Sequence, residues 1–573
     1  MAGTKRRTVT VMCTVAALVA VASPRALAEW DPRPIRGVEL SQHYQCGRDD
    51  LPEGPIQGHV PRADQQSRRA EQGYNCGLAA VGHTALNRGG RPGDNANMAW
   101  AGRCAYVAGF DGTPVAPQST PRPPPGSGVA VVSVSLDGTP RHVANLRHPG
   151  GLTTAEAINA VTTPEGRSIL VVGQYGNDIV SGPKPMDVYD VSNPDCTKFR
   201  HLGTYLWPAN IHNLTLSPDG RYVFATQPLQ AADISGLWDA DPRTGVRYLG
   251  NLQDAMDGLP LAPGPAADLD DSLPAEVRSL THPTNAAHEA WPSADGRTLY
   301  VGGVTVQSEL FTILDISQWL ARDRAGNPRG PLRIISQRSG RGHSVRTATI
   351  DGQPYVLHSE ESVFGLGFGC VPETAAPFAG PAQPWLTNIA DPTNPRRVSQ
   401  FGLEINDPVN CLAQVAAGEN SSVHYHDVDD PADTTFVMAS MWNAGLRIFD
   451  VRDPAHPTEV AYFNPGDIDG SPATLLDHAW GHVRYDAATG QIWLATAYGG
   501  FWVLRLEGEL RDHLQLPTLD VPTDDPGRAG TRGVRTTVPP LGLLDLAPAT
   551  CTLSSTTATV AALATVPVKA VPG

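Results

Sequence analysis

The chain has 573 residues, a formal net charge of −15, 41% hydrophobic residues, 57 glycines and 52 prolines. The acidic balance argues against a nucleic-acid partner, because phosphate binding needs a basic surface. The high glycine and proline content argues against long helices, while the hydrophobic content is sufficient for a large core.

The N-terminus has the features of an export signal. A basic region at residues 5–7 precedes an apolar stretch at 9–22 and an Ala-Leu-Ala cleavage site that ends at Ala28. We therefore predict a signal peptide over residues 1–28, cleaved after Ala28, and a secreted, extracellular protein. Arg6-Arg7 leaves twin-arginine export open beside the general route. The apolar stretch is too short for a comfortable membrane span, so no span is expected.

Cysteines outside the cell are expected to form disulfides. The first of the eight cysteines would leave with the signal peptide. Cys370 and Cys411 flank one insertion and could pair, and Cys76 could pair with Cys104 or with Cys46. The chain has no C-x-x-C motif, so a zinc ribbon is not supported.

From residue 76 to residue 510 the sequence repeats one unit, preceded by an N-terminal segment at 29–75. In each unit a short strand leads through a turn such as Ser217–Gly220 (SPDG) into an apolar strand, and two more strands follow. Several third strands end in aspartate before a turn, as at Asp190, Asp315 and Asp450. We expect these aspartates to cap the turns with their own backbone.

Seven units start near residues 95, 155, 210, 286, 341, 421 and 479. Four short strands rich in β-branched and aromatic residues, in units of roughly 40–60 residues, are typical of propeller blades. The prediction is an all-β fold, a seven-bladed β-propeller over residues 76–510. The last unit lacks an outer strand, and segment 36–75 could supply it and close the ring.

Two stretches resemble known families. GLRIFDVRDPAHPTEVAYF (Gly445–Phe463) resembles an LVIVD repeat, a Val/Ile-rich strand that ends in Asp. That family is bacterial, usually secreted and built as β-propellers with mostly unassigned functions, and the resemblance covers most of residues 76–510. IHNLTLSPDGRYVFAT (211–226) resembles the selenium-binding protein, or methanethiol oxidase, family at a few blade starts. This second resemblance implies a propeller with a histidine-bound metal.

Five units place a histidine eight or nine residues before the residue that closes their first turn: His212, His288, His343, His424 and His482. The first strand of a propeller blade lines the central channel and begins at its mouth, so by analogy of fold these imidazoles should converge. Neutral imidazole is the commonest metal ligand, and three or four suit copper, iron or zinc. Carotenoid-cleaving oxygenases, another seven-bladed family, hold iron with four histidines. We therefore predict a transition-metal site formed by these five residues.

Two more residues are predicted to support the chemistry of this site. In a strand, residues two apart share a face, so His426 should lie below His424 in the channel as a further ligand, a hydrogen-bonding neighbour of one or a general base. Glu289 could orient a histidine of a neighbouring blade. Tyr425 should face away and pack between blades.

The structural alternative is that duplication kept one ancestral histidine in five blades, bonded to backbone or water. Histidines outside the register are predicted to be turn or surface residues: His282, His358, His456 and His478. The sequence has no serine-hydrolase elbow, Walker loop, HExxH motif or dinucleotide fingerprint. Serine hydrolases, kinases and dehydrogenases therefore have no support.

Two insertions interrupt the repeat. Residues 252–283 are acidic and proline-rich, and residues 360–384 are rich in glycine and proline. A loop over the mouth could form a lid or a wall of a substrate site. After residue 511 proline, threonine and glycine dominate, which predicts a linker and a mostly disordered tail over 511–573.

Three functional hypotheses follow. The first is a metal-dependent oxidoreductase with a copper, iron or zinc ion acting on a small-molecule substrate in the channel. The second is an extracellular or cell-surface binding or scaffold module, which recognises an extracellular ligand and whose channel histidines are structural. The third is a metal-storage or metal-sensing protein without turnover.

Overall fold

The computed structural model describes residues 38–40, 46–86, 95–109, 128–175, 183–208, 210–238, 245–252, 287–303, 309–339, 342–359, 383–466 and 476–519. These residues belong to one compact unit, residues 1–526, and the second unit, 527–573, lies outside them. The predicted signal peptide over 1–28 also lies outside the described residues. So do residues 253–283 and 360–382 of the two insertions.

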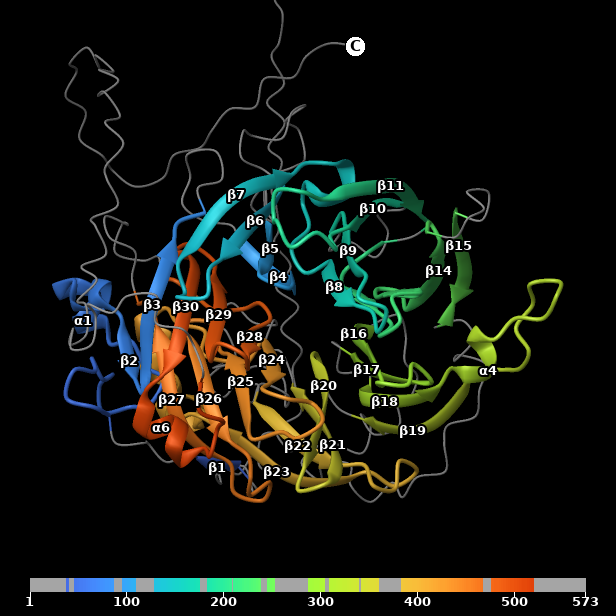
Figure 1. Ribbon diagram of the computed structural model, residues 1–573. Coiled ribbons are helices and arrows are strands. Elements are labelled where there is room, and N and C mark those ends of the chain that lie inside the picture. The colour runs from blue at the N-terminus through green and yellow to red at the C-terminus, as the bar shows by residue number, and fades with distance from the viewer. Residues whose placement is uncertain are drawn as a thin grey trace, which may run out of the picture. The chain divides into compact units, whose positions relative to one another are not determined.

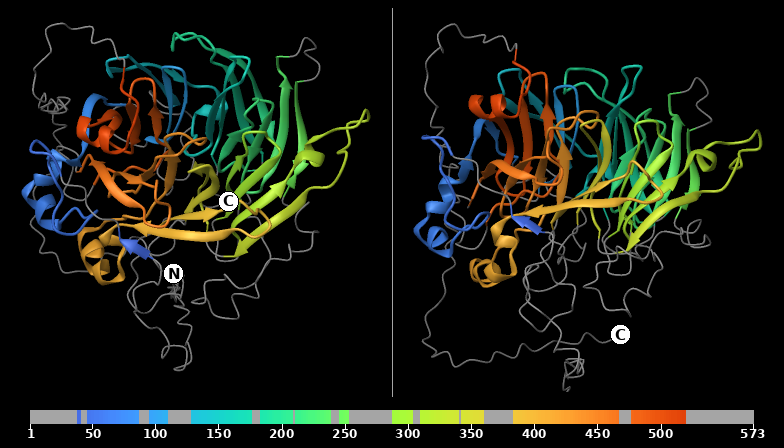
Figure 2. Two further views of the ribbon diagram at one scale, coloured as in Figure 1. Left: turned by 60° about the horizontal axis from the view of Figure 1, so that its bottom comes forward. Right: turned by 90° about the horizontal axis from the view of Figure 1, so that it is seen from below.

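Seven small sheets are arranged around a ring (Figure 1). Within each sheet, neighbouring strands of the repeat are antiparallel and follow one another in chain order. The strands of each blade run across the thickness of the ring in the side views (Figure 2). The predicted seven-bladed β-propeller is thereby confirmed.

The first four blades each comprise four strands. Blade 1 contains β4 (Asn95–Ala101), β5 (Cys104–Gly109), β6 (Val129–Val134) and β7 (Pro140–Leu146). Blade 2 contains β8 (Ile158–Thr162), β9 (Ser168–Gly173), β10 (Lys184–Asp190) and β11 (Arg200–Trp207). Blade 3 contains β12 (Leu214–Leu216), β13 (Tyr222–Ala225), β14 (Gln230–Gly236) and β15 (Gly245–Asn251). Blade 4 contains β16 (Ala287–Pro292), β17 (Thr298–Gly303), β18 (Glu309–Asp315) and β19 (Arg333–Ser339).

The last three blades recruit strands from the N-terminal part of the chain. Blade 5 contains β20 (Val345–Ile350), β21 (Gln353–Ser359), β22 (Pro384–Asn388), β23 (Arg396–Gly402) and the added β1 (Val38–Leu40). Blade 6 contains β24 (Tyr425–Val428), β25 (Phe436–Ser440), β26 (Leu446–Asp450), β27 (Thr458–Asn464) and the added β2 (Tyr74–Cys76). Blade 7 contains β28 (Arg484–Asp486), β29 (Gln491–Thr496), β30 (Gly500–Leu506) and β3 (Leu78–Thr84).

The strand that closes the ring differs from the one expected. β3, at residues 78–84, pairs antiparallel with β30 and completes blade 7. Segment 36–75, where the closing strand was expected, instead contributes β1, which is parallel to β23, and most of β2, which pairs with β27. The N-terminal strand does close the ring, but from immediately beyond the predicted segment.

The turns follow the residue types that predicted them. Asp219 accepts the backbone N–H of Arg221, and Ser217 Oγ accepts the N–H of Tyr222. Gly220 has φ +68°, a left-handed conformation that costs glycine little. As predicted, Asp190, Asp315 and Asp450 each accept the N–H of the residue two positions further on.

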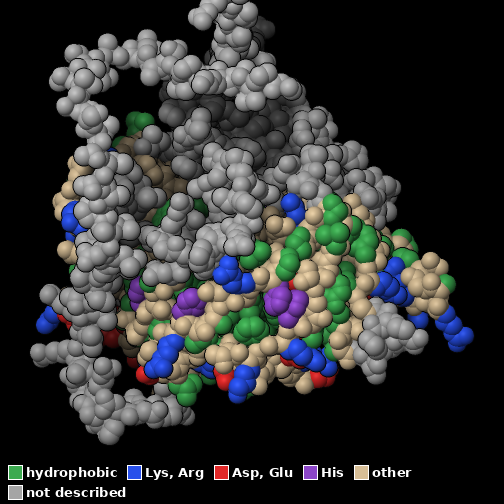
Figure 3. Space-filling model, turned by 90° about the horizontal axis from the view of Figure 1, so that it is seen from above, with side chains coloured by type: hydrophobic (Ala, Val, Ile, Leu, Met, Phe, Trp, Pro, Cys, Tyr) green, Lys and Arg blue, Asp and Glu red, His purple; other side chains and the backbone are tan. Residues whose placement is uncertain are grey.

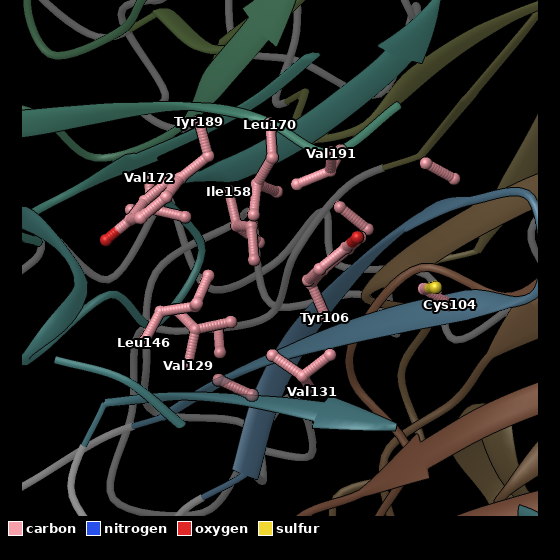
Figure 4. Close-up of a cluster of buried hydrophobic side chains, with 14 of the residues drawn as sticks. Cys104, Tyr106, Val129, Val131, Leu146, Ile158, Leu170, Val172, Tyr189 and Val191 are labelled. Atoms are coloured by element: carbon pink, nitrogen blue, oxygen red, sulfur yellow. The ribbon is translucent and has the colours of Figure 1, made fainter. Parts of the chain in front are cut away.

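The hydrophobic core lies between adjacent blades. Tyr106, Val129 and Val131 of blade 1 pack against Leu170 and Val172 of blade 2 (Figure 4). The alternate residues of the same strand face blade 7 instead, where Val132 packs near Trp493. Each blade is therefore apolar on both faces, which explains the almost continuous hydrophobic strands.

The N-terminal segment is fastened to blade 6. A disulfide joins Cys46 to Cys76 in β2. Arg447 is fully buried and donates to Glu53 at 2.8 Å and to Glu459 at 3.1 Å. A buried guanidinium is tolerated only with such partners, so Glu53 ties the segment to the blade. Short helices α1 (Arg62–Ser67) and η1 (Arg69–Gln72) complete the segment.

The second disulfide joins Cys104 in β5 to Cys196 after β10, and so links blades 1 and 2. The Cys46–Cys76 pairing was among the expected ones, whereas Cys76–Cys104 is wrong. Cys370 lies outside the described residues, so its pairing stays a prediction.

The folded part extends past the expected boundary at residue 510. Helix α6 (Gly508–His513) buries Leu510, and Leu514 beyond it is also buried. The remaining short helices are η2 (Pro149–Gly151), α4 (Ser317–Leu320), η4 (Glu404–Asn406), η5 (Pro408–Asn410) and α5 (Cys411–Ala417). None of the described helices combines the length and the apolar character that a membrane-crossing helix needs. The predicted tail from residue 520 lies outside the described residues.

Candidate metal centre

The predicted histidines lie where the inner strands begin. His212, His343 and His482 each precede an inner strand by two residues, and His424 precedes β24 by one. His288 lies inside β16, where the pairing with β17 shifts by one residue. These positions escape the regular strand ladder, so strand alternation does not dictate where their side chains point.

Four of the five histidines form one buried cluster: His212, His288, His343 and His424. The ring centroids of His212 and His288 lie 4.4 Å apart, those of His288 and His343 3.6 Å, and those of His343 and His424 4.5 Å. None of the four is more than 5% exposed. Other histidine side chains reach the surface on the face drawn in Figure 3. The structure therefore brings together the imidazoles of blades 3 to 6.

A carboxylate from blade 2 joins the cluster. Glu156 Oε2 lies 3.3 Å from His288 Nε2 and 3.7 Å from His212 Nε2. The two Nε2 atoms of His212 and His288 are 2.8 Å apart. Neighbouring ligands of one ion, each about 2.1 Å from it, are about 3.0–3.4 Å apart. The 3.3 Å separation lies within this range, and the 2.8 and 3.7 Å separations lie just below and just above it, so small side-chain shifts would bring all three atoms to the distances of one transition-metal ion.

A second set of donor atoms includes the same carboxylate. Glu156, His343 and His424 offer one donor atom each, all within 4.8 Å of one another. His424 Nδ1 donates to the backbone carbonyl of Trp480. This hydrogen bond fixes the ring tautomer and leaves Nε2 with a lone pair, the arrangement usual for metal-binding histidines.

His288 is held in the form that binds metals. Burial lowers its pKa well below the usual value, and the neighbouring His343, His212 and His424 lower it further. Its Nδ1 atom is buried and has no hydrogen-bond partner among the described residues. Such an unsatisfied polar atom costs about 1–3 kcal/mol and is uncommon in a protein interior. Imidazoles with one carboxylate suit copper, iron or zinc.

Tyr425 reaches across the channel to the carboxylate. Its hydroxyl donates to Glu156 Oε2 and accepts a hydrogen bond from Asn213 Nδ2 at 2.8 Å. The prediction that Tyr425 faces away is wrong. β24 begins at Tyr425, so the alternation that assigned His424 to the channel does not extend across the start of the strand. The phenol therefore orients Glu156 within the cluster.

The fifth predicted ligand, His482, lies outside the cluster. Its Nδ1 is 3.2 Å from Asp427 Oδ2 and its Nε2 is 3.2 Å from Glu289 Oε1. Burial and Arg346 lower the pKa of His482, but Asp427 and Glu289 raise it, and the net shift is upward. Both ring nitrogens are engaged by side chains outside the cluster. Glu289 was expected to orient a histidine of a neighbouring blade, but the histidine that it contacts belongs to blade 7, which is not adjacent to blade 4, and lies outside the cluster.

Arg346 lies at the centre of a second buried group, which also contains Glu289, Asp427 and His482. Its guanidinium donates to Glu289 Oε1 at 2.7 Å and to Asp427 Oδ1 at 3.1 Å, and Nη2 lies 2.7 Å from His482 Nε2. It also stacks on Trp291, with Cζ 3.6 Å from the ring centroid. The group is neutral when His482 is protonated, because two carboxylates balance two cations. It ties blades 4, 5, 6 and 7 together across the channel.

His426 does not share the direction of His424. Its Nε2 lies 3.1 Å from the backbone carbonyl of Leu357 in blade 5, and the side chain is fully buried. Burial and then Arg346 lower its pKa to about 3. Tyr425 and Asp427 take the channel face of β24 instead. His426 therefore faces a neighbouring blade rather than the donor atoms of the cluster.

Sequence reasoning missed Glu156, Tyr425 and Arg346. Counting eight residues back from Gly166, in the first turn of blade 2, leads to Ile158, an apolar residue, at the position where five other blades have histidine. Ala155 has φ +44°, and the turn there displaces the functional side chain by two residues. The available clue in the sequence was Glu156, a carboxylate two residues before the position at which blade 2 lacks the recurring histidine. Arg346 carried no such clue, because its partners come from three other blades.

The histidines outside the register divide into two groups. His456 is an exposed turn residue beside Asp453, as expected. His358 is fully buried in β21, where its Nε2 hydrogen-bonds to Thr387, so the surface prediction is wrong. His478 is partly buried and stacks with Trp442, their centroids 5.1 Å apart. His282 lies outside the described residues.

Aromatic side chains flank the cluster. The Trp442 ring centroid lies 5.0 Å from that of His424, and the Trp480 centroid lies 5.4 Å from it. Tyr175 of blade 2 packs beside His212, with the two ring centroids 4.9 Å apart. Two tryptophans within van der Waals range of a candidate ligand provide intrinsic fluorescent reporters of the site.

No protein-family model and no curated protein matches this chain. Solved structures do match over most of its length. A chain of Kuenenia stuttgartiensis hydrazine synthase has a TM-score of 0.41 and 11% identity, over 73% of this chain and 97% of that one. The Cps50 (Swd1) β-propeller domain of Myceliophteria thermophila has a TM-score of 0.40 and 12% identity, over 75% and 99%. A putative 6-phosphogluconolactonase from Bacteroides uniformis has a TM-score of 0.39 and 12% identity, over 70% and 89%. Likenesses this distant say nothing about the chemistry of the present chain.

Proposed function

We propose that this chain is a secreted, metal-dependent propeller protein that acts as an oxidoreductase on a small molecule. One observation carries the proposal: four histidines from four blades and a glutamate from a fifth converge in one buried cluster. The resemblance of Gly445–Phe463 to LVIVD repeats is consistent with a secreted propeller. Two disulfides are also compatible with an extracellular location.

The geometry favours this proposal over purely structural histidines. A histidine kept for structure is expected to bond to backbone or side-chain groups through its polar atoms. His288 is buried, and its Nε2 faces His212 Nε2 at 2.8 Å and Glu156 Oε2 at 3.3 Å, two other candidate donor atoms, instead of a backbone group. His482, by contrast, is the kind of histidine that structure alone explains, because two carboxylates hold both its nitrogens.

A transition metal bound here would supply a redox centre or a Lewis acid. The protein would hold it through neutral imidazoles and place Glu156 beside them. The Tyr425 hydroxyl donates its proton to Glu156 Oε2 and is held by Asn213. The carboxylate and the phenol form a short path along which a proton can move to or from a bound substrate.

Metal content tests the proposal. Protein purified from its native compartment without an affinity tag is analysed by mass spectrometry, beside the His288→Ala and His424→Ala variants. The proposal predicts stoichiometric copper, iron or zinc in the native protein and a lower metal content in both variants. Circular dichroism checks that the variants are folded. Native protein that contains no metal and takes none up would contradict the proposal and favour the extracellular binding module.

A further inference from the structure

The donor atoms of the buried cluster divide into two sets rather than one. Glu156 with His212 and His288 forms one set, and Glu156 with His343 and His424 forms the other. Within each set all donor atoms lie within 4.8 Å of one another. We infer that the cluster holds two metal ions bridged by the Glu156 carboxylate, an inference that rests on the proposed metal site.

A single ion bound by all four histidines would require His288 and His424 to lie on opposite sides of it, which the direction of His288 does not favour. Two ligands of one ion are at most about 4.2 Å apart, twice the usual metal–nitrogen distance. The ring centroids of His288 and His424 are 6.5 Å apart. One ion could bind both only if their nitrogens lay on opposite sides of it. His288 Nε2 is instead directed at His212 and Glu156, with contacts of 2.8 and 3.3 Å.

Each set is complete by itself. It contains two imidazoles from adjacent blades, blades 3 and 4 for one set and blades 5 and 6 for the other. The shared carboxylate comes from blade 2 and offers two oxygens, so it can bind one ion with each. Two imidazoles and one carboxylate oxygen leave positions open on each ion, as catalytic sites require.

The environment of Glu156 suits a bridging role. Its side chain is 5% exposed, and Tyr425 Oη hydrogen-bonds to Oε2. Asn213 holds the phenol in place. This support fixes the carboxylate between the two histidine pairs, which face one another across the 3.6 Å contact of the His288 and His343 rings. Two ions about 4 Å apart can bind one small oxygen ligand or oxyanion between them.

Copper(II) is the probe that separates one ion from two. The full secreted chain is stripped of metal, dialysed against copper(II), and analysed for bound copper and for its electron paramagnetic resonance. The inference predicts about two copper equivalents in the wild type, with a resonance well below one spin per copper, because bridged copper(II) ions couple magnetically. This measurement needs no variant and so does not depend on variant folding.

Matched variants then assign each ion to its set. His212→Ala should lose one copper and leave the other, held by His343 and His424, with a full uncoupled resonance. His424→Ala should lose the copper held by His343 and His424 and keep the one held by His212 and His288. His142→Ala, which changes an exposed histidine of β7, should keep both coppers. Circular dichroism confirms the fold of each variant.

The remaining outcomes are distinct. One copper in the wild type, lost in both cluster variants, would overturn the two-ion inference and leave the proposed metal function intact. Two coppers with full, uncoupled resonance would overturn the Glu156 bridge. Failure to bind copper, zinc or iron would overturn both this inference and the proposed function.

Discussion

Replacing Arg346 by methionine should destabilise the protein more than any exposed ion pair could. The change removes a guanidinium that is 4% exposed and pairs with Glu289 and Asp427, themselves 0% and 11% exposed. Methionine keeps much of the apolar stem but leaves the two buried carboxylates without the guanidinium, with His482 as the ring that still contacts both. Breaking a buried ion pair by removing one partner costs about 3–5 kcal/mol. We expect a loss within this range.

A matched control separates burial from charge. Arg452→Met removes an arginine that pairs with Asp450 at 2.6 Å but is 33% exposed. Exposed pairs contribute about 0–1 kcal/mol. Urea unfolding at pH 7, followed by circular dichroism and tryptophan fluorescence, gives both values. Equal losses of unfolding free energy for Arg346→Met and Arg452→Met would refute the idea that the buried group around Arg346 ties the blades together.

The Arg346→Met variant also tests how the stability of the fold depends on pH. Burial raises the pKa of Glu289, but Arg346, His482 and the Val345 N–H lower it more strongly, so the net shift is far downward. A depressed folded pKa stabilises the protein above the unfolded value and loses this effect as pH falls. Without Arg346 the pKa of Glu289 rises. The stability gap between wild type and variant should therefore narrow below about pH 4.3, the ordinary glutamate value.

Three more changes are informative. The raised pKa of His482 stabilises the fold fully below about pH 6.5, and this stabilisation is lost as pH rises through the folded pKa. The free energy of unfolding should therefore fall from pH 6 to 9 in wild type but not in His482→Gln. Parallel pH profiles for the two proteins would argue against a raised pKa of His482. Cys104→Ser opens a disulfide whose cysteines are 92 residues apart, and should cost about 2–5 kcal/mol; an unchanged urea midpoint under oxidising conditions would contradict this. Tyr425→Phe removes the hydrogen bond to Glu156 and should weaken metal binding about 10- to 100-fold, seen in a competition titration with a chromophoric chelator; unchanged affinity would show that the phenol does not position the carboxylate.

Local sequence patterns predicted the ring of blades well. The Ser-Pro-Asp-Gly turn at 217–220 and the aspartates that end third strands are local devices, and each forms the hydrogen bonds that its residue type requires. The recurring histidine position was also local. Four of its five members converge because each stands just before, or at a break in, an inner strand.

The parts that could not be predicted depend on contacts between distant segments. The closing strand β3 pairs with β30, over 400 residues away in the chain, and no nearby pattern marks that pairing. The same holds for Arg346, whose carboxylate partners belong to blades 4 and 6. Tyr425 and His426 exchanged their expected faces because the strand begins one residue later than the alternation argument assumed.

X-ray absorption at the metal edge of protein from its native compartment tests the central claim most directly. The buried cluster predicts copper, iron or zinc surrounded by nitrogen and oxygen at about 2.0–2.2 Å, with the outer-shell scattering of imidazole rings. That scattering should weaken in His288→Ala and disappear when His288 and His424 are both changed to alanine. A shell of sulfur at about 2.3 Å, or no bound metal, would contradict it.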